Sequence, residues 1–488
     1  MKMNSAVHLA LFAVLAIPLG VQAQQAAKPK MYKVIDVGTF GGPNTSLSLP
    51  PILNNRGAAV GQADTNLPDP FSPNCMQGDC FLGLAFEWQN GKLTNLGGLA
   101  PGVDSYAFSI NSTGQIVGVS ENGAIDPLTG FPETRGVLWE NGKIIDLGTL
   151  GGYDSIASTN NDRGEIVGGA LNATPDAFAY CQQPFPYATQ VHAVRWEGGV
   201  IHDLGTLGGN DSCAFFVNKG GEIAGISYTG SVPTATGYPI MDPFLWKDEQ
   251  LIDLGTLGGN FGYPTGLNNR RQVVGQSNLS GDLTFHPFYW ERGVLHDLGT
   301  FGGPSGSANG INNDGQVVGY GDLPGGPCKG FSCVHHAFLW EHGVKTDLGT
   351  LPTEICSNAV SINQSGQILG YSTPFCNSET YHPVLWENGA MYDVRALIVP
   401  GSDITLGDLL EINDRGEIVG FGLTPSGDLH TVVLVPQGDC DDACEARIAD
   451  SHINPAAVPV RAMTSGLKAT QHARFASRNH LPNPGPHN

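Results

Sequence analysis

Residues 146–152 read DLGTLGG, residues 161–168 read NDRGEIVG, and after Trp196 the first of these motifs returns at Asp203. The second motif, an Asn-x-x-Gly segment followed by two apolar residues and a further Gly, marks eight units of about 51 residues. Its copies begin at Asn54, Asn111, Asn161, Asn218, Asn268, Asn312, Asn363 and Asn413, with Arg271 in the place of one turn glycine. A fixed period of this length is the signature of a repeat architecture.

The spacing between these recurring motifs shows which connections have a constant length and which one varies in length. Each Asn lies seven residues before the Gly that closes its motif, and each Trp lies seven residues before the Asp or Asn of the next DLGTLGG-like motif. The distance from the closing Gly to the Trp instead varies from 15 to 28 residues. Asn-x-x-Gly favours a type I turn, and Asn-Gly, as at residues 141–142, favours a two-residue hairpin. Each unit is therefore predicted to form four short strands, a to d, with one variable b-to-c loop.

Four strands per repeat of this length predict the blade of a β-propeller. The first d strand, over residues 32–37, precedes the first unit, and the last unit ends with a c strand over residues 431–435. These two strands can share one sheet, which removes the open edges that a line of repeats would leave. We therefore expect an all-β, eight-bladed β-propeller of four-stranded blades, whose last blade is closed by the N-terminal strand. A seven-bladed propeller and an open β-solenoid are the alternatives.

The segments outside the repeats are assigned by composition. Residues 1–23 have a basic start, a short apolar run and Val-Gln-Ala before Gln24, which is the pattern of a secretory signal peptide. Residues 24–435 form the predicted propeller, and residues 436–488, which break the period, are expected to be a mobile C-terminal tail. The protein is thus predicted to be secreted or periplasmic, without a membrane span, because no apolar run is long enough to cross a bilayer.

The combination of DLGTLGG, Ile-Asn-x-x-Gly-x-Ile-Val-Gly and His-Ala-Phe-Leu-Trp, as at residues 336–340, resembles the repeats of the HAF family of bacterial extracellular repeat proteins. The resemblance covers about residues 32–435. It implies export and a repeat fold, and it implies no particular activity.

The net charge of the chain limits the classes of partner that it is expected to bind. The chain has 45 acidic residues against 24 basic ones, which gives a formal net charge of −21. A field of this sign repels phosphate backbones, so nucleic acid is not an expected partner. The variable b-to-c loops are the predicted binding surface, because ligand contacts collect on loops held by a rigid scaffold. The alternative is that these loops vary freely and bind nothing.

The ten cysteines of an exported chain are expected to form disulfides that staple loops. Close spacing predicts the pairs Cys75–Cys80, Cys328–Cys333 and Cys440–Cys444. The positions of the loops predict two further pairs, Cys181–Cys213 and Cys356–Cys376.

The inner a strands are where the blades converge, and three consecutive units carry an Asp before a Ser there, at Asp104, Asp154 and Asp211. Three carboxylates at the mouth of the channel could bind Ca²⁺, or two of them could act as the acid and base of an inverting glycosidase. The alternative is that each Asp caps its own turn.

Aromatic and histidine side chains give weaker evidence for a ligand-binding or metal-binding site. Tyr180, Phe185 and Tyr187 in the long third loop could stack on sugar faces, or pack against one another and stabilise the loop. Five c strands begin with a histidine, and these side chains are interpreted as structural because they stand too far from one another to share an ion. They are His192, His286, His336, His382 and His430.

These features predict an exported, monomeric binding module that takes a carbohydrate, peptide or protein ligand on its variable face. No cofactor is required, and Ca²⁺ is the one candidate. A secreted hydrolase or lyase with a carboxylate site at the channel mouth is one alternative. A purely structural surface repeat is the other.

Overall fold

The computed structural model describes residues 28–181, 187–325, 333–376, 378 and 381–453. In these residues the regular structure is β, apart from the short 3-10 helix η1 (Val394–Leu397) and the helix α1 (Asp442–Ile453). Consecutive strands pair antiparallel, so each unit contributes a first, second and third strand in sheet order, followed by a fourth.

The strands occupy equivalent positions in successive units. The first strands are β2 (Gly41–Ser46), β6 (Ser105–Ile110), β10 (Ser155–Asn160), β14 (Ser212–Val217), β18 (Gly258–Leu267), β22 (Gly306–Ile311), β26 (Cys356–Ile362) and β30 (Thr405–Ile412). The second strands are β3 (Ala59–Pro68), β7 (Ile116–Ile125), β11 (Ile166–Pro175), β15 (Ile223–Tyr228), β19 (Val273–Leu279), β23 (Val317–Asp322), β27 (Ile368–Thr373) and β31 (Ile418–Leu423).

The outer positions repeat in the same way. The third strands are β4 (Phe81–Gln89), β8 (Pro132–Glu140), β12 (Thr189–Glu197), β16 (Met241–Lys247), β20 (Phe285–Glu291), β24 (His335–Glu341), β28 (His382–Glu387) and β32 (Leu429–Asp439). The fourth strands are β5 (Lys92–Asn95), β9 (Lys143–Asp146), β13 (Val200–Asp203), β17 (Gln250–Asp253), β21 (Val294–Asp297), β25 (Val344–Asp347), β29 (Ala390–Asp393) and the N-terminal β1 (Lys30–Asp36).

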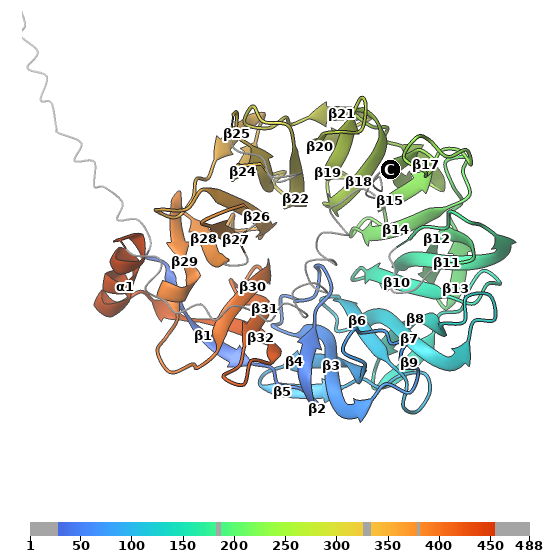
Figure 1. Cartoon of the computed structure of the whole chain (residues 1–488), viewed down its shortest axis with the longest axis horizontal. Helices are drawn as coiled ribbons and strands as arrows, with labels where there is room; N and C mark the ends of the chain where they lie inside the picture. Colours follow the sequence, from blue (N-terminus) through green and yellow to red (C-terminus); the bar gives the residue numbers. More distant parts are fainter. Residues whose placement is uncertain (1–27, 182–186, 326–332, 377, 379–380, 454–488) are drawn as a thin grey trace, which may run out of the picture.

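The sheets stand around a ring, with β6, β10, β14, β22, β26 and β30 toward its centre (Figure 1). This is the arrangement of a β-propeller, as the repeat predicts. Over the described residues there are six four-stranded sheets and one eight-stranded sheet. The larger sheet is joined at its middle by a single parallel pair, Met241 of β16 with Phe261 of β18.

The ends of the chain meet in one sheet. Strand β1 pairs antiparallel with β32, with Val34 opposite Leu434 and Asp36 opposite Val432. The amide of Val37 adds a hydrogen bond of 3.0 Å to the carbonyl of Thr431. The predicted pairing of residues 32–37 with residues 431–435 is therefore confirmed.

The asparagine of each Asn-x-x-Gly turn links its unit to the next one. Its side-chain oxygen accepts two amides of its own turn, as Asn363 Oδ1 does from Ser365 and Gln367. Its side-chain nitrogen donates to the backbone carbonyl of the asparagine in the following unit, and the last donor, Asn413, returns to Asn54. The eight bonds, of 2.8 to 3.1 Å, form a closed circle through residues 54, 111, 161, 218, 268, 312, 363 and 413.

The core lies between successive sheets. Val117 on β7 packs with Ile166 on β11 and Trp196 on β12. The indole nitrogen of Trp196 donates to the carbonyl of Leu147 in the preceding unit, 2.8 Å away. The tryptophan that recurs in the repeat thus fills the space between two sheets and satisfies its one polar atom there.

The glycine that closes each motif is required by close approach and not by an unusual φ. A Cβ at Gly168 would lie 1.9 Å from the carbonyl oxygen of Ile156 on the neighbouring first strand. That strand carries a register shift between Ala157 and Thr159, and its backbone occupies the space that a side chain would need. The same approach recurs at Gly225, where the carbonyl of Cys213 stands 2.0 Å from an added Cβ.

Regular secondary structure continues beyond residue 435, the predicted end of the propeller and start of the mobile tail. Strand β32 runs to Asp439, and α1 follows after Cys440, which is bonded to Cys444. Both cysteines are buried against Tyr32 and Leu397, because the N-terminal strand and η1 leave an apolar surface there. Residues 454–488, like the predicted signal peptide at residues 1–23, lie outside the described residues.

Four of the predicted disulfides are present: Cys75–Cys80, Cys181–Cys213, Cys356–Cys376 and Cys440–Cys444. Cys333 is also disulfide-bonded, and its predicted partner Cys328 lies outside the described residues. Among the helices of the described chain, none has the length and apolar composition needed to cross a membrane.

Candidate functional site

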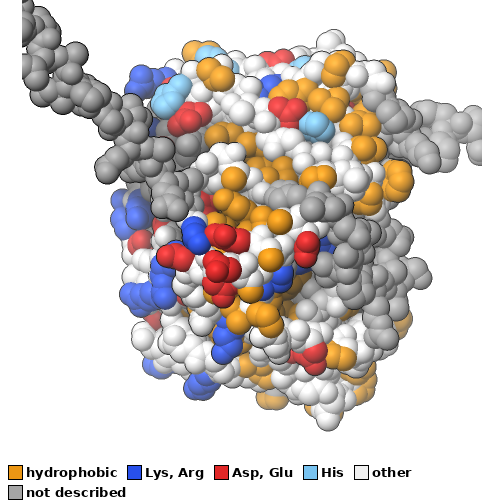
Figure 2. All heavy atoms as spheres, turned by 90° about the vertical axis from the view of Figure 1, so that its left-hand side faces the viewer, with side chains coloured by type: hydrophobic (Ala, Val, Ile, Leu, Met, Phe, Trp, Pro, Cys, Tyr) orange, Lys and Arg blue, Asp and Glu red, His pale blue; other side chains and the backbone are white. Residues whose placement is uncertain are grey.

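The connections at the two ends of the strands make two different faces. The long-loop face consists of the loops between second and third strands and of the connections from each fourth strand to the next first strand. The turn face consists of the Asn-x-x-Gly turns and of the hairpins between third and fourth strands. Figure 2 views the ring from its side and shows Lys and Arg side chains gathered toward one face.

Positive charge is nearly absent from the connections of the long-loop face. Over the described residues these connections contain eleven acidic residues and one basic residue, Arg395. The guanidinium of Arg395 is already bound to Asp393. The acidic residues are Asp69, Asp79, Asp104, Asp126, Asp154, Asp176, Asp211, Asp282, Glu354, Asp403 and Asp428.

Histidines at the start of the third strands bind carboxylates on this side of the ring. Nδ1 of His192 lies 2.8 Å from Oδ2 of Asp203 at the end of the neighbouring fourth strand, and this contact raises the pKa of the histidine. The same pair is formed by His286 with Asp297, His336 with Asp347, and His430 with Asp36. His382 binds Glu354 instead. Each histidine thus has its own carboxylate, in agreement with a structural role.

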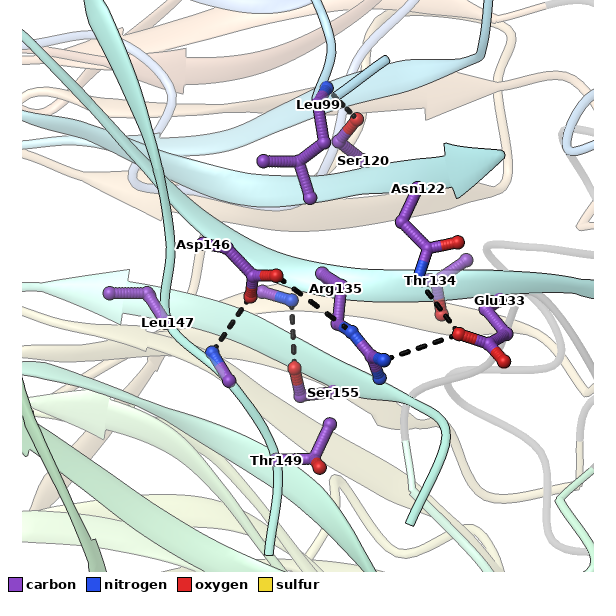
Figure 3. A network of polar contacts seen from close by, with 12 residues as sticks. Leu99, Ser120, Asn122, Glu133, Thr134, Arg135, Asp146, Leu147, Thr149 and Ser155 are labelled. Atoms are coloured by element: carbon purple, nitrogen blue, oxygen red, sulfur yellow. Dashed lines mark hydrogen bonds and ion pairs between the residues drawn. The ribbon is translucent and has the colours of Figure 1, made fainter. Parts of the chain in front are cut away.

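In the second unit Arg135 takes the place of the histidine. Its Nε lies 3.9 Å from Asp146 and its Nη2 lies 3.2 Å from Glu133, as Figure 3 shows. The cation at this position also acts on the next unit, because burial raises the pKa of Asp154 and of Asp211 while Arg135 and His192 partly oppose that rise.

The three aspartates expected at the channel mouth lie instead in three successive interfaces between sheets. All three are buried. Each accepts a backbone amide from the third strand of the preceding sheet, Asp104 from Gly83 at 2.7 Å, Asp154 from Thr134 at 2.7 Å and Asp211 from Val191 at 2.8 Å. The following serine does the same two residues further on, as Ser155 does with Gly136 (Figure 3). The Asp-Ser pair therefore clamps neighbouring units together and caps no turn of its own.

The three carboxyl groups differ in their electrostatic surroundings. Burial raises the pKa of Asp154 to about 6 and that of Asp211 to about 7, although each has a cation beside it. Burial, with the further charges of Glu121 and Asp69, raises the pKa of Asp104 to about 9. Asp104 has no cation to oppose these effects, because Leu84 and Asn95 stand in the first unit where His and Asp stand elsewhere.

Loop 69–80 of the first unit brings further carboxylates to this region. Its Asp69 meets Asp104, and its Asp79 meets the buried Asp64. Burial and the charge of Asp79 raise the pKa of Asp64 to about 8. The fourth unit shows a related break in the pattern, since Asp242 replaces the histidine opposite Asp253. Burial and Asp253 raise the pKa of Asp242 to about 7.

A central cavity of about 510 Å³ opens among the Asn-x-x-Gly turns. Its wall includes Phe215, Tyr263 and Leu410, and its rim includes the turn asparagines. One carboxyl in its wall, Glu411, accepts the amides of Ile52 and Leu53, and burial raises its pKa to about 7. Asp104, Asp154 and Asp211 are not among the lining residues described for this cavity.

The aromatic residues of the third loop pack into the protein. Tyr180 and Tyr187 lie against a cluster that includes Phe215, Tyr228 and Tyr263 from neighbouring units. Phe215 and Tyr263 are 5.0 Å apart between ring centroids. Of the two alternatives for these aromatic side chains, the geometry favours stabilisation of the loop. Phe185 lies outside the described residues.

Among the described residues, one group of three His, Cys, Asp or Glu side chains has ligand atoms all within 4.8 Å of one another. It comprises His335, Cys356 and Cys376. The two cysteines are joined to each other, so they offer no thiolate to a metal.

No known family's sequence model matches the chain, and no curated protein matches it. Several solved structures resemble it weakly. The β-propeller domain of the Trilobed protease from Pyrococcus furiosus is 9% identical with a TM-score of 0.40, covering 69% of this chain and 95% of that one. A putative gluconolactonase is 10% identical with a TM-score of 0.30, covering 84% and 94%. The acylaminoacyl peptidase of Pyrococcus horikoshii is 12% identical with a TM-score of 0.33, covering 69% and 59%.

Proposed function

We propose that this chain is an exported binding protein without catalytic activity, whose long-loop face binds a peptide or protein segment that carries basic and apolar side chains. The observation that carries the proposal is the composition of that face. Its described connections hold eleven acidic residues and a single, already paired, basic one, and the acidic side chains that reach the surface are Asp79, Asp282, Asp403 and Asp428. Such a surface attracts cationic partners and repels anionic ones.

Apolar side chains exposed in or directly beside the same loops supply the second part of the recognition. Leu283 is 82% exposed, Val232 79% and Leu67 55%. Exposed apolar groups on a rigid scaffold are typical of protein interaction sites.

The proposed architecture is an eight-bladed ring in which the eight-stranded sheet counts as two blades. The count is supported by the closed circle of eight asparagine bonds and by the single pair that joins the two halves of the large sheet. Export is supported by the disulfides, which persist in oxidising compartments. We retain the resemblance to HAF repeats and the signal peptide at residues 1–23 as parts of the proposal.

The hydrolase alternative needs two carboxyl groups facing one substrate. Asp104, Asp154 and Asp211 each bind the backbone of a different sheet, so no pair of them faces a common space. A purely structural repeat remains the outcome if no ligand binds.

The test is a binding screen against fixed peptide sets of three compositions, basic-aromatic, acidic-aromatic and neutral-aromatic, with a glycan array beside them. Preferential binding of the basic-aromatic set supports the proposal. A triple variant, Leu67→Ser, Val232→Ser and Leu283→Ser, should lose at least about tenfold in affinity, since each exposed anchor contributes about 0.5 kcal/mol or more.

The matched control is a second triple variant at exposed valines of the fourth strands, Val200→Ser, Val294→Ser and Val344→Ser. These side chains lie at the third-to-fourth strand hairpins, away from the long loops, and the control should bind as the unmodified protein does. Equal loss in both variants, preference for acidic peptides, or binding of glycans alone would refute the proposal.

A further inference from the structure

The interface between the first and second units contains three buried carboxyl groups with no cation among them. Asp69 is 3% exposed, and Asp104 and Glu121 are fully buried. Asp69 is held at the start of its loop, where its amide donates to Cys80 and the Cys75–Cys80 disulfide closes the segment. The loop thus places one carboxylate over two that belong to the next unit.

Each carboxyl group uses one oxygen to bind backbone and leaves the other without a donor. Oδ1 of Asp104 accepts the amide of Gly83 at 2.7 Å, and Oδ1 of Asp69 accepts that of Phe71 at 2.7 Å. Oε2 of Glu121 accepts the amide of Asp104 at 3.2 Å. The remaining oxygens, Oδ2 of Asp104, Oδ2 of Asp69 and Oε1 of Glu121, are buried and accept no hydrogen bond. A buried oxygen without a donor costs about 1–3 kcal/mol, and more when it is charged.

The carboxyl groups of Asp69 and Asp104 are close enough that Asp69 contributes to the raised pKa of Asp104, after burial and the charge of Glu121. Two like charges so close together are unfavourable unless a proton or a cation lies between them. At the next two interfaces Arg135 and His192 provide the positive charge, whereas the first unit has the neutral Leu84 at that position. Among the described connections of this face the one basic side chain, Arg395, is already paired with Asp393, so it does not supply the compensating charge here.

We propose that Asp69 and Asp104 together bind a calcium ion between the first and second units. The free atoms are oxygens only, and hard divalent cations such as Ca²⁺ prefer carboxylate and carbonyl oxygens to the nitrogen and sulfur ligands of Zn²⁺. Asp69, Asp104 and Glu121 do not form a group whose ligand atoms all lie within 4.8 Å of one another, so we assign two ligands, Asp69 and Asp104, and Glu121 adds negative charge beside them. Water and backbone carbonyls complete the shell of six to eight oxygens that Ca²⁺ takes.

Ca²⁺ is preferred to Mg²⁺ because the two side chains come from different units and from a loop. Mg²⁺ demands a near-ideal octahedron and gives up its water reluctantly, whereas Ca²⁺ accepts irregular and larger shells. Bound calcium would fasten loop 69–80 to the second unit. It would therefore stabilise the folded state in proportion to its occupancy.

The experiment uses the full chain with its disulfides, freed of metal with a chelator and titrated with CaCl₂ near pH 7. Isothermal titration should show binding of the ion, and the midpoint of thermal unfolding should rise by about 4 °C at saturating CaCl₂, with a smaller rise in MgCl₂. Asp69→Asn keeps the oxygen that accepts the amide of Phe71 and removes the charge. It should fold and lose most of the calcium-dependent rise, as should Asp104→Asn.

Asp154→Asn is the matched control, because Asp154 occupies the equivalent position beside Arg135. It is expected to lower the unfolding midpoint while leaving the shift caused by CaCl₂ unchanged. If Asp104→Asn fails to fold, Asp69→Asn alone decides. Absence of binding and of any shift in the unmodified chain overturns the proposal, as does a shift that persists in Asp69→Asn. Stability that falls with rising pH and ignores CaCl₂ would show that the pair shares a proton, which also overturns it.

Discussion

At the scale of single residues, the repeated asparagine acts between units as well as within its turn. Its side chain satisfies two amides of its own turn and one carbonyl of the next unit, and the Asn363 side chain and its bond to the next unit are buried. The turn function follows from local sequence, because Asn before two residues and a Gly favours that turn. The bond to the next unit depends on how the units are placed and cannot be read from one copy of the motif.

Asn363→Ala is predicted to lower the free energy of unfolding by about 2 kcal/mol, because two turn amides lose their acceptor and the buried carbonyl of Asn413 loses its donor. Ser365→Ala in the same turn is the control, since Ser365 is exposed and contributes only its amide to the turn. Urea denaturation of both variants measures the difference. Equal stability of the two variants would mean that the circle of asparagine bonds contributes little.

Gly168→Ala is predicted to destabilise by about 3 kcal/mol or to prevent folding, because the added Cβ would overlap the carbonyl oxygen of Ile156. Gly230→Ala tests the specificity of this effect, since no atom lies within 4 Å of a Cβ added there. Thermal unfolding followed by circular dichroism compares the two variants. A Gly168→Ala protein as stable as the Gly230→Ala protein would contradict the close approach.

At the scale of strands and loops, the pattern of charged pairs could have been found in the sequence. The residue eleven positions before the Asp that ends a fourth strand is His192, His286, His336 or His382 in four units and Arg135 in another. Reading this spacing would have predicted three of the His–Asp pairs and would have exposed the exceptions at Leu84 and Asp242, but it would have paired His382 wrongly, since His382 binds Glu354. The contacts of acidic loop residues with other units could not be predicted from this spacing. Asp69 reaches Asp104 through a loop whose path depends on a disulfide and on the neighbouring sheet.

Asp242→His is predicted to stabilise the fourth unit, because the new histidine can form with Asp253 the His–Asp pair found in other units. The pKa of Asp242 is raised to about 7, well above its value of about 4 in an unfolded chain. A raised carboxyl pKa gives stability that is present below the unfolded pKa and is lost as the pH rises through the folded one. The unmodified protein should therefore lose up to about 4 kcal/mol between about pH 4 and pH 8 from this group.

Asp242→Asn is the companion variant, because it removes the charge without adding a cation. Both variants should flatten the fall in stability with pH, and Asp242→His should be the more stable of the two below about pH 7, where the histidine is protonated. Urea unfolding at a series of pH values gives the comparison. A pH profile unchanged by either substitution would show that Asp242 does not carry this dependence.

At the scale of the whole molecule, the repeat predicts the ring and its closure. A single fourth strand precedes the first unit and the last unit lacks its fourth strand, so the two ends are expected to share one sheet. The division into two faces also follows from the lengths of the connections. What sequence alone misplaces is the arc of aspartates, which lies between sheets and not at an opening. The reason is that the position of a side chain relative to its neighbouring unit depends on the stagger and twist of the sheets, which the motif does not encode.

The closed ring supports both the turn face, with its circle of asparagine bonds, and the long-loop face that is proposed to bind cations and basic ligands. Amide hydrogen exchange of residues 30–36 in the intact protein tests it most directly. If β1 is paired with β32, the alternate amides of β1 that donate to β32 should be protected and exchange at a rate close to that of the central strand β7. Exchange within minutes, at the rate of a frayed terminal strand, would contradict the closed ring.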